Sequence, residues 1–281
     1  MMKEKTLIFG ASGQTGRELF KIIPESIPVF HGVNKEANEI NFENADEIKK
    51  LIEKNNPSII VNAVALTNVD RCETEKELAY KINSESVRIM ARMCSARKIK
   101  LVHVSTDYVF DGETGNYRED AIPNPINYYG LSKLMGDNFA QIPENSMIVR
   151  TSGVYGYSRN FPKFAYETLK KGDKLNTING YYSPIHSRNL AKAIAELIDR
   201  DFNGIINVCG EKISRYDLAL KISKRFGLKG EIEKMDNIQN LKAKRPFDSS
   251  LYIGFSKLIL NFDFYSTESN LKEFEKTVKI Q

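Results

Sequence analysis

The feature that most constrains the fold is a regular alternation of two patterns in the first half of the chain. Short apolar runs predict β-strands at Thr6–Phe9, Ile27–Phe30, Ser58–Val61, Lys100–Ser105 and Met147–Thr151. Between them, apolar residues recur every three to four positions and predict helices at Arg17–Ile23, Asp46–Lys54, Glu73–Arg97 and Ser132–Gln141. Right-handed crossovers place such helices over both faces of a sheet. We therefore expect an α/β fold with a doubly wound parallel sheet.

The second half of the chain is less regular. Helices are predicted at Phe161–Lys170, Leu190–Asp199, Tyr216–Phe226 and Glu268–Lys279, and a short strand at Ile205–Val208. The stretch Lys229–Ser250 is charged and irregular and contains Pro246. Such a stretch is typical of a small second lobe. We therefore expect a smaller C-terminal lobe beside the sheet.

A glycine-rich loop, Gly10-Ala11-Ser12-Gly13-Gln14-Thr15-Gly16, follows the first predicted strand and opens a helix. Glycines let the backbone turn tightly and approach a diphosphate, and the N–H groups and dipole at the helix start stabilise its negative charge. This strand–loop–helix context is what a dinucleotide-binding motif requires. The loop predicts a Rossmann-type site for a nicotinamide dinucleotide. Its candidate contacts are Gly10, Ser12, Gly13, Gln14, Thr15, Gly16 and Arg17.

The position of this loop sets the expected domain organisation. We expect residues 1–155, together with about 182–210, to form the NAD(P)-binding domain. Residues 156–181 and 211–281 are expected to form a substrate-binding lobe.

The residues after the second strand bear on the choice of cofactor. An acidic residue there binds the ribose hydroxyls of NAD, whereas basic residues accommodate the 2′-phosphate of NADP. No carboxylate occurs between Phe30 and Glu36, while Arg17 and Lys35 are candidates to reach a 2′-phosphate. NADP(H) is therefore favoured, with NAD(H) as the alternative. Solvated surface charge is the competing interpretation of both basic residues.

Three further residues indicate hydride chemistry. One predicted strand ends in Ser105-Thr106-Asp107-Tyr108, and ligands of open α/β sheets bind beyond the carboxyl ends of strands. Tyr129 and Lys133 are four residues apart, on one face of a helix start. An ammonium group near a phenol lowers the pKa of the phenol, as general acid–base chemistry needs. Thr106, Tyr129 and Lys133 are therefore candidate catalytic residues for hydride transfer at a carbonyl. The competing interpretation of the last two is an exposed helix pair.

At these residues the sequence resembles the extended short-chain dehydrogenase/reductases and, more narrowly, the dTDP-4-dehydrorhamnose reductase family. The resemblance runs from about Lys5 to Leu258. It is carried by the glycine loop, Asn62-Ala63, Ser105-Thr106-Asp107-Tyr108-Val109-Phe110-Asp111-Gly112 and Tyr129-Gly130-Leu131-Ser132-Lys133. Supporting matches are Ala65-Leu66-Thr67-Asn68-Val69-Asp70-Arg71-Cys72-Glu73, Arg150-Thr151-Ser152 and Arg245-Pro246-Phe247-Asp248-Ser249-Ser250-Leu251.

The resemblance implies a role for each matching residue. Tyr129 would protonate the C4 oxygen of a nucleotide-linked 4-keto sugar, most simply dTDP-4-dehydro-L-rhamnose, as hydride arrives from the nicotinamide. Lys133 would lower the pKa of Tyr129 and bind the nicotinamide ribose, and Thr106 would hydrogen-bond the substrate carbonyl. The implied cofactor contacts also include Asn62, Ala63, Ala65, Tyr129 and Lys133. The implied substrate contacts are Thr67, Val69, Tyr108 and Arg245, the last of these at the diphosphate.

The sequence also departs from the family pattern. The family usually has a tryptophan after the Arg-Thr-Ser string, but this chain has Gly153 there and contains no tryptophan. The loop Ile178–Pro184 differs from the family's acidic-glutamine version. Some members bind magnesium at a dimer interface. Glu18 matches one such carboxylate, but its partner carboxylates are not recognisable, so no metal site is predicted, and a homodimer stays open.

Composition bears on three further questions: membrane contact, nucleic-acid binding and disulfide bonds. The longest apolar runs are far shorter than the roughly 18 residues that span a bilayer, and no leader-like segment opens the chain, so we expect a cytoplasmic protein without membrane contact. The 41 Lys and Arg residues are interspersed with 36 Asp and Glu residues and form no basic run, which argues against a nucleic-acid partner. The three cysteines are widely spaced and predict free thiols.

Two alternative functions stay open. The first is another nucleotide-sugar enzyme of the same fold, an epimerase or a dehydratase. Dehydratases usually need an acidic pair beside the strand-end threonine, whereas Thr106 is followed by Asp107 and Tyr108. The second is a non-catalytic, dinucleotide-binding regulatory subunit of the methionine adenosyltransferase type, which shares the fold and the Arg-Pro pattern and also lacks the tryptophan.

Overall fold

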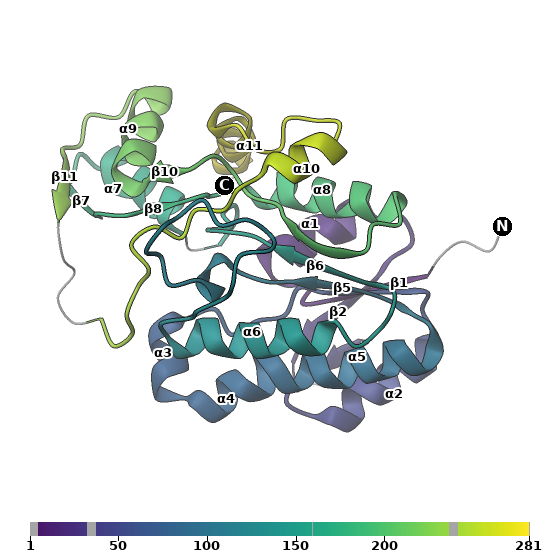
Figure 1. The fold of residues 1–281 in the computed structure, drawn as a ribbon. Coiled ribbons are helices and arrows are strands. Elements are labelled where there is room, and N and C mark those ends of the chain that lie inside the picture. Colours follow the sequence, from purple (N-terminus) through teal and green to yellow (C-terminus); the bar gives the residue numbers. More distant parts are fainter. Residues whose placement is uncertain (1–4, 33–37, 159, 236–240, 281) are drawn as a thin grey trace.

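A central parallel sheet organises the molecule. The computed structural model describes residues 5–32, 38–158, 160–235 and 241–280. Within these ranges, seven strands pair in the order β3-β2-β1-β4-β5-β6-β9 (Figure 1). They are β1 (Thr6–Phe9), β2 (Ile27–His31), β3 (Glu39–Ile40), β4 (Ile59–Asn62), β5 (Lys100–Val104), β6 (Ser146–Arg150) and β9 (Gly204–Asn207). Chain order reverses between β1 and β4, so the predicted doubly wound parallel sheet is confirmed.

Helices cover both faces of this sheet. Helices α2 (Ala45–Asn55), α5 (Ser86–Arg97) and α6 (Tyr128–Ala140) lie on one face, and α1 (Gln14–Ile22) and α8 (Ser187–Asp199) lie on the other (Figure 1). Strand β1 shows why a continuous apolar run predicted a strand correctly. Leu7 and Phe9 belong to one buried cluster and Ile8 to another, because successive side chains of a strand point to opposite faces. A strand covered on both faces is therefore a continuous apolar run.

The predicted helix Glu73–Arg97 is wrong as a single element. The chain forms α3 (Val69–Thr74), α4 (Lys76–Tyr80), a π-helical turn at Lys81–Glu85 and then α5. The side chain of Asn83, within the π turn, is completely buried and bonds both the N–H and the carbonyl of Leu66. The widened turn thus fastens the loop after β4, and π turns are frequent at functional sites.

The second lobe contains two small sheets and the helices that cover them. Strand β7 (Leu175–Ile178) pairs in parallel with β11 (Ile232–Met235), and β8 (Tyr181–Tyr182) pairs antiparallel with β10 (Ile213–Ser214). Helices α7 (Phe161–Lys170) and α9 (Arg215–Phe226) pack against them. Strand β11 corrects the expectation that this stretch is wholly irregular. Its side chains are mostly exposed, so no apolar alternation marks it.

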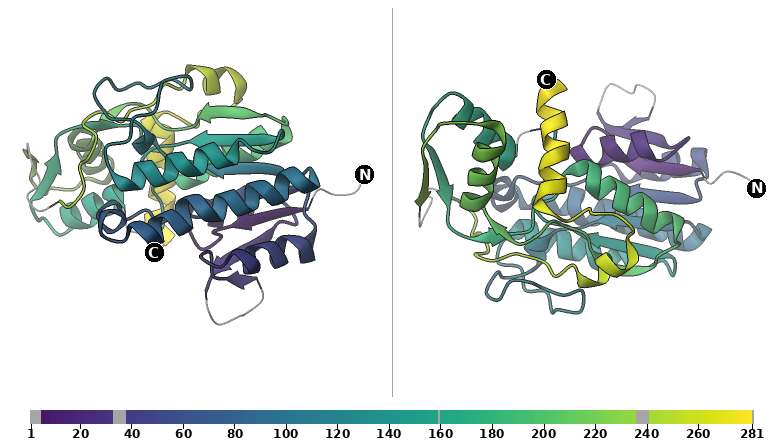
Figure 2. Two further views of the ribbon diagram at one scale, coloured as in Figure 1. Left: turned by 60° about the horizontal axis from the view of Figure 1, so that its bottom comes forward. Right: turned by 90° about the horizontal axis from the view of Figure 1, so that it is seen from above.

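The C-terminal helix joins the two parts. Helix α10 (Gly254–Ile259) precedes α11 (Thr267–Ile280), which stands between the α7–α9 lobe and α8 (Figure 2). Leu271 and Phe274 of α11 are buried in the core cluster of the second lobe. Among the described helices, none is both long enough and apolar enough to cross a bilayer.

Candidate active site

A cleft of about 530 Å³ opens at the carboxyl ends of the central strands. Gly13, Ala63, Thr106 and Thr151, which line it, follow β1, β4, β5 and β6 respectively. Arg215 and other residues of the second lobe line the opposite wall. The chain reversal between β1 and β4 lies at this edge, where open α/β sheets bind their ligands.

The glycine loop needs its glycines. Gly10 has φ +84°, and a Cβ there would lie 2.9 Å from the carbonyl carbon and oxygen of Ala63. A Cβ on Gly16 would lie 2.2 Å from the carbonyl oxygen of Gly10. The N-cap of α1 is Gly13, which offers no side-chain acceptor to the first N–H groups of the helix. A close-packed loop that ends at an uncapped helix start fits the diphosphate of a dinucleotide.

Tyr129 lies in the first turn of α6, at the floor of the cleft. The side chain of Asn127 caps this helix by accepting a hydrogen bond from the Gly130 N–H at 2.8 Å. Tyr129 is 9% exposed, and its ring meets the edge of Tyr108 at a centroid distance of 5.7 Å. Burial raises the pKa of Tyr129 above its usual value, and a hydrogen bond with Thr106 offsets part of that rise.

Lys133 lies one turn further along α6 and is 1% exposed. Its Nζ donates to the carbonyl oxygen of Val104 at 2.8 Å and lies 3.4 Å from Nε2 of His103. Burial lowers the pKa of Lys133 to about 8. Both Tyr129 and Lys133 line the cleft, as expected. The effect of Lys133 on the pKa of Tyr129 stays a prediction.

Asp107 organises the hydroxyl groups around the end of β5. Its Oδ1 accepts the Thr106 hydroxyl at 3.1 Å, and its Oδ2 accepts the hydroxyls of Ser152 and Ser249 at 2.6 Å each. Burial raises the pKa of Asp107, and these three hydrogen bonds act in the opposite direction. Thr106 also accepts the Tyr108 N–H at 3.2 Å, so its hydroxyl is held in place. Asp107 was part of the quoted motif, but its role depends on Ser249, which is distant in sequence.

Most predicted site residues line this one cleft. They are Gly13, Gln14, Thr15, Ala63, Ala65, Thr67, Val69, Thr106, Tyr108, Tyr129 and Lys133. Gly10 and Gly16 shape the loop from behind, and Ser12 is exposed beside it. Asn62 is buried beneath the cleft, where its Nδ2 lies 3.1 Å from Nδ1 of His103.

Two predicted arginines lie outside the lining of the cleft. The Arg17 guanidinium carbon lies 4.8 Å from the centre of the Tyr157 ring. Arg245 pairs with Asp70 at 3.0 Å and donates to the carbonyl oxygen of Ala243 at 2.8 Å. The remaining candidate for contact with a 2′-phosphate, Lys35, lies outside the described residues.

The sequence reasoning missed the wall that the second lobe contributes. This wall includes Asn160, Phe161, Pro162, Tyr182, Arg215 and Ser249. Gly153, which departs from the family pattern, faces it with φ +47°, and a Cβ there would lie 2.6 Å from the Tyr182 ring. Ser249 stands in the Arg245–Leu251 match and Tyr182 in the departing loop Ile178–Pro184, but neither residue was assigned to the cleft, and no motif marks Arg215.

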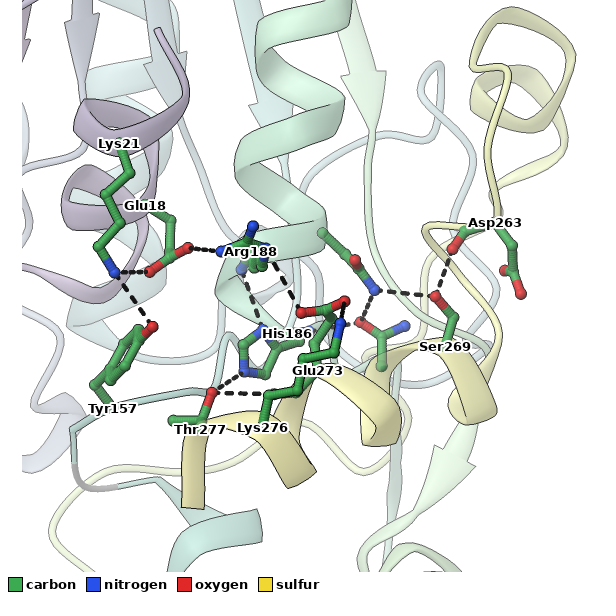
Figure 3. A network of polar contacts seen from close by, with 12 residues as sticks. Glu18, Lys21, Tyr157, His186, Arg188, Asp263, Ser269, Glu273, Lys276 and Thr277 are labelled. Carbon is green, nitrogen blue, oxygen red and sulfur yellow. Dashed lines mark hydrogen bonds and ion pairs between the residues drawn. The ribbon is translucent and has the colours of Figure 1, made fainter. Parts of the chain in front are cut away.

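Glu18 is paired with cations outside the cleft. Its carboxylate is completely buried and accepts Lys21 at 2.7 Å, while Arg188 lies 3.5 Å away on its other side. Arg188 also approaches Glu273 of α11 at 3.6 Å, so the network joins α1, α8 and α11 (Figure 3). Among the described residues, no group of three or more His, Cys, Asp or Glu side chains is arranged to hold a metal ion.

Known proteins are similar to this chain over most of its length. A family model described as "RmlD substrate binding domain" matches residues 4–280. The dTDP-4-dehydrorhamnose reductase of Aggregatibacter actinomycetemcomitans is 31% identical over 265 residues, which cover 88% of this chain and 90% of that protein.

Two solved structures are similar over nearly the whole chain. A hypothetical dTDP-4-dehydrorhamnose reductase from Sulfolobus tokodaii is 48% identical with a TM-score of 0.89, covering 93% of this chain and 96% of that one. The dTDP-4-dehydrorhamnose reductase of Bacillus anthracis, in complex with NADP, is 29% identical with a TM-score of 0.90. The match covers 98% of this chain and 99% of that one. The chain therefore belongs to the RmlD substrate-binding-domain family, the dTDP-4-dehydrorhamnose reductase family that its motifs resemble.

Proposed function

We propose that the protein is an NAD(P)H-dependent reductase that converts the 4-keto group of a nucleotide-linked 6-deoxy sugar, dTDP-4-dehydro-L-rhamnose, into a hydroxyl group. The observation that carries this proposal is the convergence of Thr106, Tyr129 and Lys133 on the cleft that the glycine loop also lines. The names of the relatives in this family support the same reaction.

The cofactor would lie along the sheet side of the cleft. Gly13 and Thr15 at the start of α1 would hold its diphosphate, and Ala63 and Lys133 would line its nicotinamide half. The bound nicotinamide supplies the hydride. A preference for NADP(H) is supported by Arg17, which is exposed one residue beyond the loop, and by the NADP bound to the Bacillus anthracis relative.

Tyr129 would supply the proton to the C4 oxygen. Its burial holds the phenol protonated at neutral pH, which is the form a general acid needs at the start of the reaction. The buried Lys133, on the same face of α6, would stabilise the phenolate that remains after proton transfer.

Thr106 would act as the second donor to the same oxygen. Its hydroxyl donates to Asp107 in the structure, and rotation of the O–H group about the Cβ–Oγ bond would redirect that proton to a bound carbonyl. Asp107 would then keep the two serine hydroxyls as donors. Because the two serine hydroxyls stay bound, the buried carboxylate loses little stabilisation when the Thr106 proton turns away.

The test follows nicotinamide absorbance with dTDP-4-dehydro-L-rhamnose and either NADPH or NADH. We expect turnover by the native protein and a loss of kcat of about 10²- to 10⁴-fold in Tyr129→Phe, since that variant lacks the acid. The dissociation constant for NADPH should change far less than kcat, because Tyr129→Phe removes only one hydroxyl from the site.

Other outcomes would contradict the proposal in distinct ways. Oxidised cofactor that stays bound through purification, with interconversion of C4 epimers, would indicate an epimerase. Tight binding of the dinucleotide without turnover, together with co-purification of a methionine adenosyltransferase, would indicate the regulatory subunit.

A further inference from the structure

The cleft contains a positive charge that the proposed chemistry does not use. Lys133 and Arg215 are the two cationic residues that line it among the described residues. Lys133 is engaged with the backbone of β5 and with His103. Arg215, by contrast, forms no ion pair with any carboxylate in the described part of the chain, whereas Arg245 is paired with Asp70. A guanidinium without a counter-charge in a cleft favours an anionic ligand.

Arg215 is nevertheless held in a defined position. It is the first residue of α9, which Ser214 caps by accepting the Asp217 N–H at 3.0 Å. Its guanidinium carbon lies 4.6 Å from the centre of the Tyr182 ring. Burial raises the pKa of the neighbouring Tyr108, and the positive charge of Arg215 counters that rise. Arg215 is therefore fixed by aromatic neighbours that leave its charge available.

Tyr182 supplies a second, independent indication of a ligand. It lines the cleft and is 5% exposed, yet its buried hydroxyl has no hydrogen-bond partner among the described residues. A buried hydroxyl without a partner is unfavourable, so such a group marks a place where a ligand or a water completes the site. The contact of its ring with Gly153 fixes the side chain against the sheet side of the cleft.

The position of this pair relative to Tyr129 defines which part of a substrate it meets. Tyr108 packs edge-on against Tyr129 and also interacts with Arg215, so Arg215 lies one side chain away from the proposed acid. In a nucleotide-linked sugar, the hexose ring alone separates C4 from the diphosphate. A cation one side chain away from the acid is therefore placed for the diphosphate.

We infer that Arg215 and Tyr182 form the subsite that binds the diphosphate of the nucleotide-linked sugar. This inference rests on the proposed function and deepens it. The guanidinium presents paired N–H donors to phosphate oxygens, and the tyrosine hydroxyl donates alongside it. Arg245, which the sequence favoured for this role, has its guanidinium engaged by Asp70 and Ala243.

The test compares the binding of nucleoside diphosphates and monophosphates by titration calorimetry in the presence of saturating NADP⁺. We would test dTDP, UDP and GDP, each beside its monophosphate, so that the result does not depend on which base the substrate carries. For the diphosphate that the native protein binds, we expect Arg215→Gln to weaken affinity roughly 10- to 100-fold and to change monophosphate affinity much less. Tyr182→Phe, which keeps the ring that supports Arg215, should weaken the same diphosphate about 3- to 10-fold.

Controls separate this subsite from general damage. Arg200→Gln removes an exposed arginine at the end of α8 and should leave every affinity unchanged. NADPH affinity and the thermal unfolding midpoint should be unchanged in Arg215→Gln. With the keto-sugar substrate, that variant should raise KM and largely keep kcat, since it acts on binding rather than on proton transfer.

Three outcomes would overturn the inference. The first is an Arg215→Gln variant that prefers the diphosphate over the monophosphate as strongly as the native protein does. The second is an Arg245→Gln variant that loses this preference instead. In both cases turnover by the native protein would leave the proposed function standing. The third is a native protein that binds none of the three diphosphates; the turnover assay then decides separately whether the proposed function stands.

Discussion

Two clusters of titratable side chains lie on different sides of the molecule and differ in burial: in one every side chain is buried, whereas in the other only the carboxylates are buried and their cationic partners reach solvent. The cleft cluster comprises His103, Lys133, Asp137 and Arg150, all at most 3% exposed. The helix cluster comprises Glu18, Lys21, Arg188 and Glu273, between α1, α8 and α11 (Figure 3). In the cleft cluster the charged groups approach one another only to between 3.4 and 3.8 Å. In the helix cluster, Lys21 contacts Glu18 at 2.7 Å.

The pKa shifts show what this difference means. Burial lowers the pKa of Lys133 to about 8 and that of His103 to about 4, and it also lowers the pKa of Arg150. In the helix cluster, burial would lower the pKa of Lys21, but its hydrogen bonds with Glu18 and Tyr157 outweigh burial and raise it. Burial in the cleft cluster therefore disfavours the charged forms of its basic side chains, and shifts of this kind are typical of catalytic sites, whereas hydrogen bonds in the helix cluster stabilise the charged form of Lys21.

The largest expected effect comes from replacing the lysine of each cluster in the same way. Lys133→Met should lower kcat at least about 100-fold, because the phenolate of Tyr129 loses its nearby cation. The same change should raise the free energy of unfolding by about 1 to 3 kcal/mol, since it removes a desolvated charge. The measurements are nicotinamide absorbance and urea denaturation.

Lys21→Met is the matched control for this comparison. Lys21 is partly exposed and well paired, so its loss should leave kcat intact and slightly destabilise the protein. Equal effects of the two substitutions on kcat, or a less stable Lys133→Met, would break the distinction between the clusters.

The second prediction removes the buried carboxylate of the helix cluster. Glu18→Ala should reduce the free energy of unfolding by about 1 to 2 kcal/mol, because Lys21 and Arg188 lose the buried carboxylate that they pair with but stay in contact with solvent. The kcat of the folded fraction should be unchanged. Glu77→Ala, which removes an exposed partner of Lys81, should leave stability unchanged in the same denaturation experiment. A stable Glu18→Ala protein that fails to bind NADPH would instead place Glu18 in the cofactor site.

The third prediction concerns the carboxylate of the cleft cluster. The negative charge of Asp137 raises the pKa of Lys133 and so opposes the larger effect of burial. Asp137→Asn should therefore lower the pKa of Lys133 further and move the basic limb of the kcat/KM profile to lower pH, by about one unit. Glu273→Gln is the control from the helix cluster and should leave the profile in place. A shift to higher pH in Asp137→Asn would contradict this assignment.

The smallest expected effect is a difference in acid stability. Burial would raise the pKa of Glu273, but the hydrogen bond with Lys276 and the nearby positive charges lower it below its ordinary value of 4.5. A lowered carboxyl pKa stabilises the folded state above the ordinary value, and that contribution disappears as the pH falls through the folded-state pKa. Thermal unfolding should therefore show a deficit for Glu273→Gln near neutral pH that narrows below about pH 4.5. A deficit that is constant with pH would refute the ion-pair origin.

The sheet side of the site was more predictable than the lobe side. Strand β1, the glycine loop and the Tyr129–Lys133 pair are local patterns, so their spacing in the sequence carries their meaning. Arg215 and Tyr182 acquire theirs only when the second lobe folds over the sheet. Nothing near Arg215 in the sequence distinguishes it from a surface residue, and Tyr182 was marked only by lying in a loop that departs from the family pattern. The same reason hid β11, whose exposed side chains leave no apolar signature, and the π turn, which depends on the contact between Asn83 and Leu66.

The hydrogen bond between Ser249 and Asp107 bears on motion as well as on chemistry. Ser249 belongs to the second lobe, and Asp107 lies at the end of a sheet strand, directly beside Thr106. If the lobe swings outward, this carboxylate loses one of its three hydroxyl donors while it is still largely enclosed, which is unfavourable. The hydrogen bond between Ser249 and Asp107 therefore ties the second lobe to the end of β5. The same carboxylate accepts the Thr106 hydroxyl, so the position of the second lobe and the orientation of that hydroxyl are energetically linked.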